Sequence, residues 1–199
     1  MGVKDDPYST AQAAILLTYR NTKGDQLANS AWLRVAIRYT RAAKNSHLIQ
    51  IKSHEHRASF DLKRLWWCCI VRDRLISIGV RRPLQIMDTI FDSEQGCLSL
   101  KEIQHETTSE VYDTEAKSLM CKIFISQCQL AAVLTLPATV LYDMNLAKEY
   151  QASDLEKCQS AKEALEDWRE DFMKNENVTK SAIHHSVLLD FRLTLLYYQ

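Results

Sequence analysis

Glycine and proline are scarce in this sequence, with four and three among 199 residues. All-β domains need many tight turns, which these two residues commonly supply, and no segment alternates clearly between polar and apolar residues. Hydrophobic residues make up 46% of the chain, which is enough for a substantial core, and the length corresponds to one domain. We therefore predict an all-α fold, an irregular multi-helix bundle.

An excess of charge of either sign is also missing, because 25 Lys and Arg balance 25 Asp and Glu. A neutral chain has no overall field that attracts it to nucleic acid or to an anionic membrane, so such binding needs a local patch. Arg34, Arg38 and Arg41 form one basic stripe on a helix predicted over 26–43. The stripe is either a solvated face or a contact for an acidic partner. No base-reading motif accompanies it, so we expect DNA to be contacted only indirectly.

Paired cysteine motifs are absent. The six cysteines include the adjacent Cys68 and Cys69 but no C-x-x-C, and no signal peptide precedes them. This pattern indicates reduced thiols in an intracellular compartment, and it disfavours both a disulfide framework and a thiolate zinc site. Three histidines lie in the polar stretch 46–60, at a spacing that does not align ligands on a helix: His47, His54 and His56. We predict a surface loop there and no metal site.

Charged residues are missing from the twenty positions 123–142. An apolar run of this length can span a bilayer. This one contains Ser, Gln and Thr as well as Pro137, and no cluster of Lys or Arg marks one end. We therefore predict a buried helix that is broken near Pro137, and no membrane contact.

The other expected helices follow from apolar spacing and from capping signals. One helix is expected to begin at a capping box of Ser9 and Gln12, and another at Ser153 and Glu156. Behind the second box, an apolar stripe predicts an amphipathic helix docked on the core: Leu155, Cys158, Leu165, Trp168 and Phe172. Further helices are expected over 113–136, from Pro137 to about 150 and over 179–197, and an irregular segment over 83–109.

The most apolar helix, predicted over 61–78, has charged residues at its centre. Apolar side chains, among them Trp66 and Trp67, surround its axis, which is typical of a buried central helix. Asp73 then projects into the core, where a carboxylate must be paired. Gly79 can end the helix in a left-handed turn. The simplest interpretation is a structural pin, in which Asp73 pairs with an arginine and holds the helix to the next loop. A catalytic Asp73 is the alternative, but no nucleophile or second acid lies near it, so we assign no catalytic residue.

Three groups of residues in this region resemble a known family pattern. They are Lys63-Arg64-Leu65-Trp66-Trp67, then Arg72-Asp73-Arg74-Leu75, and then Gly79-Val80-Arg81-Arg82-Pro83. The series is similar to the signature of the fungal-specific transcription factor domain, the middle regulatory region of zinc binuclear cluster activators. Its Arg-Arg-Pro ending resembles the cutinase transcription factor branch. The resemblance assigns a structural role to Trp66, Trp67, Asp73, Arg74, Gly79, Arg81, Arg82 and Pro83.

This resemblance implies a nuclear regulatory domain that restrains or releases an attached activator. The implied partners are transcriptional co-regulators or a full-length relative, with a small-molecule effector. In the family, DNA is bound by a separate N-terminal module in which six cysteines hold two zinc ions. The C-x2-C-x6-C run of that module is not found here. We therefore assign no cysteine to zinc and expect no cofactor within 1–199, which we expect to be one regulatory domain, incomplete at both ends.

Two other classes of function stay open. One is a stand-alone helical interaction module, either a truncated decoy or a dimerisation partner. The other is an enzyme-like domain that binds a small molecule. That second class requires Asp73 to face an open cavity without an arginine partner, so the surroundings of Asp73 discriminate between the classes.

Overall fold

The computed structural model describes residues 6–20, 27–50, 56–87, 96–107, 113–142 and 152–179. Within these ranges the chain is helical and contains no strand, which confirms the predicted all-α fold. The elements are α1 (Pro7–Leu17), α2 (Ala28–Gln50), α3 (His56–Val80), α4 (Leu100–Ile103), η1 (Gln104–Thr107), α5 (Thr114–Val133), α6 (Thr135–Tyr142) and α7 (Ala152–Thr179).

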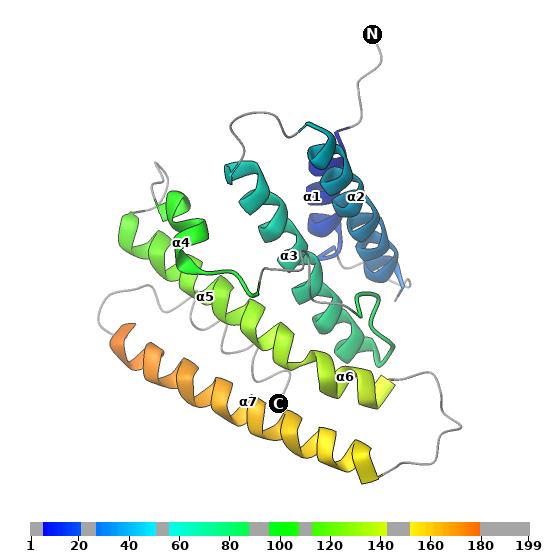
Figure 1. Ribbon diagram of the computed structural model, residues 1–199, viewed down its shortest axis with the longest axis vertical. Coiled ribbons are helices and arrows are strands. Elements are labelled where there is room, and N and C mark those ends of the chain that lie inside the picture. Colours follow the sequence, from blue (N-terminus) through cyan, green and yellow to red (C-terminus); the bar gives the residue numbers. More distant parts are fainter. Residues whose placement is uncertain are drawn as a thin grey trace.

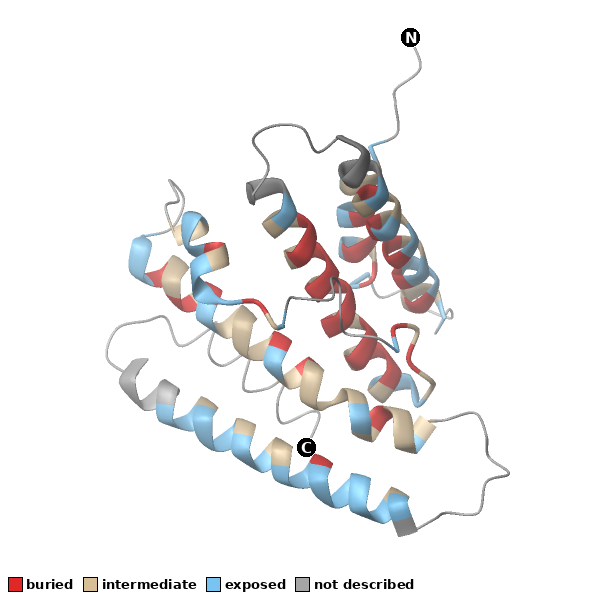
Figure 2. Ribbon diagram, viewed as in Figure 1, coloured by how far each residue is buried: buried red, intermediate tan, exposed pale blue. Residues whose placement is uncertain are grey.

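Helix α3 lies at the centre of the bundle. It packs against α1 and α2 on one side and against α5 and α6 on the other (Figure 1). Helix α7 lies outside α5 and α6 and contacts both. Buried residues concentrate along α3 (Figure 2), where Trp66 and Trp67 are only 4% and 3% exposed. Because helices enclose α3 on two sides, apolar residues are needed around most of its axis.

Helix α1 begins two residues earlier than the expected capping box. The carboxylate of Asp6 accepts hydrogen bonds from the backbone N–H groups of Tyr8, at 3.2 Å, and Ser9, at 3.1 Å. Pro7 occupies the first helical position, where its missing N–H costs nothing. The prediction that Ser9 and Gln12 cap this helix is wrong, because Asp6 supplies a charged acceptor closer to the free N–H groups.

In the polar stretch 46–60, the described residues 46–50 and 56–60 are helical, so the prediction of a surface loop is wrong for these residues. Helix α2 continues to Gln50, and α3 already begins at His56. Neither helical part contains glycine or proline, which would disfavour a helix there. His47 lies on α2 and His56 on α3, whereas His54 lies outside the described residues.

Three boundaries in the second half also differ from expectation. The segment 83–109 contains α4 and η1, and α4 begins with a capping box of Ser99 and Glu102. The break in the apolar run falls at Leu134, so that Pro137 lies in the first turn of α6 without a helical bond to lose. Ser153 lies inside α7 and does not cap it.

Helix α7 docks through only part of its predicted apolar stripe. Trp168 donates a hydrogen bond from Nε1 to the carbonyl of Ser126 on α5, at 3.1 Å, and stacks on Phe172 with ring centroids 5.4 Å apart. Leu155 is 74% exposed and Cys158 is also exposed, so the N-terminal turns of the stripe do not dock as predicted. The helix expected over 179–197 falls outside the described residues, apart from Thr179.

Candidate functional site

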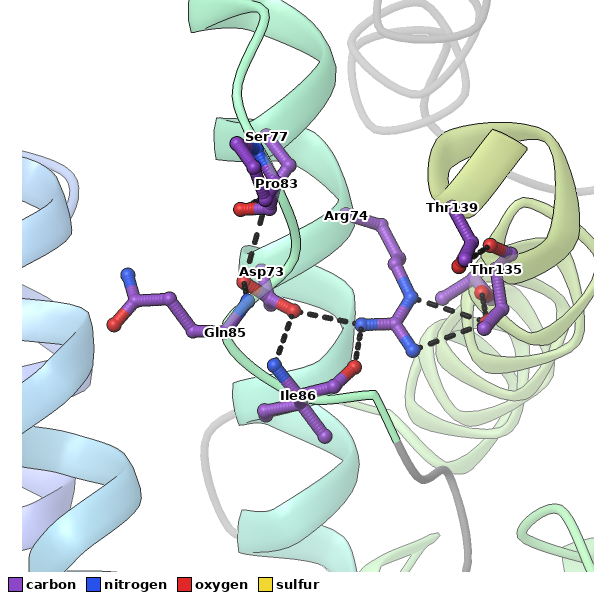
Figure 3. A network of polar contacts seen from close by, with 9 residues as sticks. Asp73, Arg74, Ser77, Pro83, Gln85, Ile86, Thr135 and Thr139 are labelled. Carbon is purple, nitrogen blue, oxygen red and sulfur yellow. Dashed lines mark hydrogen bonds and ion pairs between the residues drawn. The ribbon is translucent and has the colours of Figure 1, made fainter. Parts of the chain in front are cut away.

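Asp73 and Arg74 form a buried ion pair at the centre of the molecule (Figure 3). Both side chains are fully buried, and Arg74 Nη1 lies 2.7 Å from Asp73 Oδ2. Asp73 therefore faces an arginine in a closed environment, which is the opposite of the arrangement that an enzyme-like site at Asp73 requires. The arginine is its own neighbour on α3, and the sequence pattern did not indicate which arginine to expect.

The same carboxylate holds the segment that follows α3. Asp73 accepts hydrogen bonds from the backbone N–H groups of Gln85 and Ile86, each at 3.0 Å. Ser77, one turn along the helix, makes longer contacts of 3.5 Å with Asp73 and with the carbonyl of Pro83. The chain therefore folds back along α3 after Pro83, and Asp73 lies at the contact between the two segments.

Arg74 extends this network to the other side of the bundle. It donates to the carbonyl of Ile86 at 2.8 Å, and to Thr135 Oγ1 through Nε at 3.1 Å and Nη2 at 3.0 Å. Thr135 is the first residue of α6, so three separate segments meet at one guanidinium (Figure 3). Sequence analysis missed Thr135, Gln85 and Ile86, because an isolated threonine and two backbone groups carry no recognisable pattern.

Burial is the largest influence on the pKa of both charged groups. It raises the pKa of Asp73 and lowers the pKa of Arg74. The hydrogen bonds from Gln85 and Ile86 and the charge of Arg74 oppose the rise at Asp73, and the charge of Asp73 opposes the fall at Arg74. Four donors lie at or below 3.5 Å around the carboxylate, and these hydrogen bonds offset part of the desolvation cost of the ion pair.

The end of α3 is shaped by Arg81 rather than by Gly79. Arg81 has a left-handed backbone with φ of 52°. The N–H of Arg82 donates to the carbonyl of Ser77 at 3.0 Å, and the N–H of Arg81 to that of Ile78 at 3.4 Å, which is the Schellman arrangement. The prediction that Gly79 forms the left-handed turn is wrong, because packing of the next segment on Asp73 extends the helix to Val80.

Arg82 lies between two charges. Its Nε and Nη2 atoms are buried and have no hydrogen-bond acceptor among the residues that the structure describes. Burial lowers the pKa of Arg82, the charge of Asp73 raises it, and the nearby charge of Arg34 lowers it again. Because Arg74 already neutralises Asp73, Arg82 adds net positive charge beside Arg34 on α2.

The three arginines of the basic stripe lie exposed on α2, beside this segment. Together with Gln85 they border an open groove of about 590 Å³, lined by Arg34, Ile37, Arg38, Arg41, Ala42, Asn45 and Gln85. Arg41 lies over the ring of Trp66, 5.6 Å from its centroid, and Arg38 over Tyr39, at 5.9 Å. The structure thus brings the stripe next to the signature residues, which the sequence did not indicate.

The basic residues at the start of the signature have their own acidic partners. Lys63 is 3% exposed, and its Nζ lies 2.7 Å from Oε1 of Glu102 on α4. Arg64 pairs with Asp61 and with Glu106 of η1. These pairs fasten α4 and η1 to the N-terminal half of α3, so both basic residues link elements of the bundle.

The described residues do not fit a thiolate zinc cluster. Among them, the group of three side chains close enough to share a metal ion is Asp61, His105 and Glu106, and it contains no cysteine. The guanidinium of Arg64 already pairs with both of its carboxylates. All six cysteines are free thiols, and burial raises the pKa of Cys68 to about 11 and that of Cys69 to about 12.

One stretch of the described residues, Thr114–Tyr142, is long and apolar enough to cross a membrane. A third of its most apolar window is buried in the bundle, and Cys121, Cys128 and Ala131 belong to the hydrophobic core. A core helix of a water-soluble domain has the same composition. The absence of membrane contact stays a prediction.

Comparison with known proteins places this architecture in a family. A family model described as the fungal specific transcription factor domain matches residues 6–170. Cutinase transcription factor 1 beta of Fusarium vanettenii is 36% identical over 98 residues, which cover 45% of this chain and 10% of that protein. A transcription factor of Fusarium pseudograminearum is 25% identical over 96 residues, 48% of this chain and 11% of that protein.

The chain therefore spans about a tenth of the length of either relative through the matched residues. No solved structure matches it. The range matched by the family model, residues 6–170, contains the whole Asp73 network and the arginine stripe, and it ends inside α7. Since the family model covers most of the sequence, the chain belongs to the fungal-specific transcription factor domain family.

Proposed function

We propose that this chain is a regulatory domain of a nuclear fungal transcription factor, and that it acts by binding other molecules, without catalysis. The family match over residues 6–170 carries this proposal. Both relatives are themselves named as transcription factors, and transcription factors are not enzymes. The closed surroundings of Asp73 support the proposal, because they leave this buried carboxylate without access to a substrate.

In this proposal the domain controls an attached activator through co-regulators, a full-length relative or a small-molecule effector. In the same proposal DNA is reached through a separate zinc cluster module, as the family resemblance implies. The rigid connection of α2, α3 and α6 through the Asp73 network suits a domain that presents a fixed surface to such partners.

A reporter assay in fungal cells tests the proposal. Residues 1–199 are placed between a heterologous DNA-binding module and an activation segment, and output is compared with an unstructured linker of equal length. We expect the domain to change output several-fold at equal protein level, together with nuclear localisation. Output that equals the linker control under all growth conditions tested would contradict a regulatory role.

A further inference from the structure

The open groove between α2 and the segment after α3 gathers positive charge that no described acidic residue pairs with. Helix α2 contains no Asp or Glu over its whole length, Ala28–Gln50. Arg34, Arg38 and Arg41 make no ion pair with any residue that the structure describes, and Arg82 adds its charge close to Arg34. On a chain with zero net charge, such a local patch selects for a negatively charged partner.

We propose that this groove binds a short acidic peptide segment of a partner protein, with carboxylates on the three arginines and apolar side chains against Ile37 and Ala42 at the edges of the stripe. This inference rests on the proposed function in that it specifies the class of partner of a regulatory domain. The groove itself is defined by the structure, so a binding measurement on the purified chain is independent of the reporter assay.

The dimensions of the groove match a peptide. From Arg34 to Asn45 the helix rises about 16 Å, the length of about five residues of extended chain. Carboxylates on alternate residues of an extended peptide lie about 7 Å apart, close to the helical rise of about 6 Å between Arg34 and Arg38. Ile37 and Ala42 line the groove at the two edges of the arginine stripe, and Ile37 is only 6% exposed. The apolar side chains of the peptide are placed to contact these edges.

Two of the three cationic groups, those of Arg38 and Arg41, lie over aromatic rings before any ligand binds. Arg41 stacks on buried Trp66 and Arg38 on Tyr39, which reduces the conformational entropy that these side chains lose on binding. Gln85 forms the opposite wall: its backbone N–H is bonded to Asp73, and its side chain donates to the carbonyl of Ser30 on α2 at 3.2 Å. Figure 3 shows the side chain of Gln85 extending from the segment after α3 toward α2. The buried ion pair thus positions one wall of the groove.

Two other kinds of ligand fit the groove less well. A small anion is usually enclosed on most sides by its site, whereas this groove is open to solvent along its length. Duplex nucleic acid is bound through many phosphate contacts, whereas three exposed arginines line this groove on a neutral chain. An acidic peptide uses both the charges and the apolar lining residues.

Fluorescence anisotropy with the purified 199-residue chain tests the proposal. The probe is a labelled peptide of about 12 residues in which Asp and Glu alternate with Leu, and the control peptide carries Asn and Gln in place of the acids. We expect the acidic peptide to bind at least about tenfold more tightly than its control, and the difference to shrink as salt rises from about 50 mM to about 300 mM.

A triple variant, Arg34→Gln, Arg38→Gln and Arg41→Gln, is expected to weaken acidic-peptide binding at least about tenfold. The matched control removes the same charge from exposed positions of α7 through Lys157→Gln, Lys162→Gln and Arg169→Gln, and is expected to change the dissociation constant less than about twofold. Circular dichroism and thermal unfolding check that each variant is folded. If the triple variant does not fold, the single change Arg38→Gln is used, with an expected loss of about threefold.

Three results would overturn the proposal. One is equal binding of the acidic and amide peptides by the wild-type chain. Another is an equal loss of binding in the α2 and α7 triple variants, which would show a general charge effect. The third is tighter binding of a competitor, either duplex DNA or citrate, through the same three arginines. Tighter binding of DNA would reassign the groove to nucleic acid. Tighter binding of citrate would reassign it to a small polyanion. A tenfold loss in the α2 variant alone supports the groove even if the reporter assay shows no regulation.

Discussion

Arg74 on α3 and Thr135 on α6 are joined by two hydrogen bonds, from Nε at 3.1 Å and from Nη2 at 3.0 Å to the same hydroxyl oxygen. The two residues are 61 positions apart in the sequence. The hydroxyl of Thr135 in turn donates to the carbonyl of Ala131 at 3.0 Å, so the break between α5 and α6 is tied to the buried ion pair. This contact makes the position of α6 depend on a buried charged residue in the C-terminal third of α3.

Replacing Thr135 with valine removes this acceptor and keeps the shape of the side chain. We expect Thr135→Val to lower the free energy of unfolding by about 1–3 kcal/mol, because it leaves two N–H groups of a fully buried guanidinium without an acceptor. Chemical denaturation measures the change. Thr139→Val is the matched control, since the hydroxyl of Thr139 donates to the carbonyl of Thr135 within its own helix and bonds to no other described residue. We expect it to cost less than about 0.5 kcal/mol.

Removing the Asp73 carboxylate tests the structural pin directly. We expect Asp73→Ala to lower the free energy of unfolding by ~3 kcal/mol or more, because it strands the buried charge of Arg74 and releases the N–H groups of Gln85 and Ile86. Asp171→Ala, on an exposed carboxylate of α7, is the control and is expected to change stability by less than about 0.5 kcal/mol. A loss below ~1 kcal/mol for Asp73→Ala would show that the pair contributes little to stability.

The left-handed backbone of Arg81 stores strain that glycine relieves. At φ of 52°, a residue with a Cβ atom is disfavoured by about 1–2 kcal/mol, whereas glycine adopts this conformation freely but loses more entropy on folding. The balance predicts that Arg81→Gly raises the free energy of unfolding by about 0.5–1 kcal/mol. Arg81→Ala keeps the Cβ atom and is expected to leave stability nearly unchanged. A loss of stability in the glycine variant, measured by thermal unfolding, would contradict this assignment of strain.

The pair of Lys63 and Glu102 predicts one component of acid unfolding. Burial raises the pKa of Glu102, but hydrogen bonds from Lys63 and from Ser99 outweigh burial, so its pKa lies below the ordinary 4.5. As the pH falls below 4.5, Glu102 therefore takes up a proton in the unfolded chain at a higher pH than in the folded domain. The stability that this pair contributes is lost as the pH falls through the pKa of Glu102 in the folded domain. We expect Glu102→Gln to be less stable than wild type at neutral pH, with the difference shrinking below pH 4.5. A difference that stays constant with pH, in denaturation curves over this range, would contradict the assignment.

The cysteines are expected to differ sharply in reactivity. Cys158 is exposed, whereas burial raises the pKa of Cys68 to about 11 and that of Cys69 to about 12. Near pH 8 the native domain is therefore expected to react with iodoacetamide at Cys158 before Cys68 and Cys69, which are expected to react only after unfolding. Mass spectrometry of time points identifies the order of modification. Early labelling of Cys69 would show that α3 is not enclosed as Figure 2 indicates.

The sequence by itself determined the class of fold, the buried central helix and the need to pair Asp73. Scarce glycine and proline, helical apolar spacing and the cost of burying a charge are local properties that do not depend on the neighbours of α3. It also carried the family signature. Helix ends were predicted less well: Asp6 displaced the expected cap at Ser9, and Arg81 took the left-handed position expected at Gly79, because competing acceptors and tertiary packing decide such ends.

Only the tertiary structure decided what surrounds Asp73 and what borders the groove. The side chains of adjacent helical residues diverge by about 100°, so periodicity does not predict that Arg74 turns back to pair with Asp73. Every residue except proline has a backbone N–H, so the donors at Gln85 and Ile86 have no sequence signal. Arg34, Arg38 and Arg41 share one face by helical spacing alone. Their position beside Gln85 depends on the chain folding back along α3, which is long-range packing.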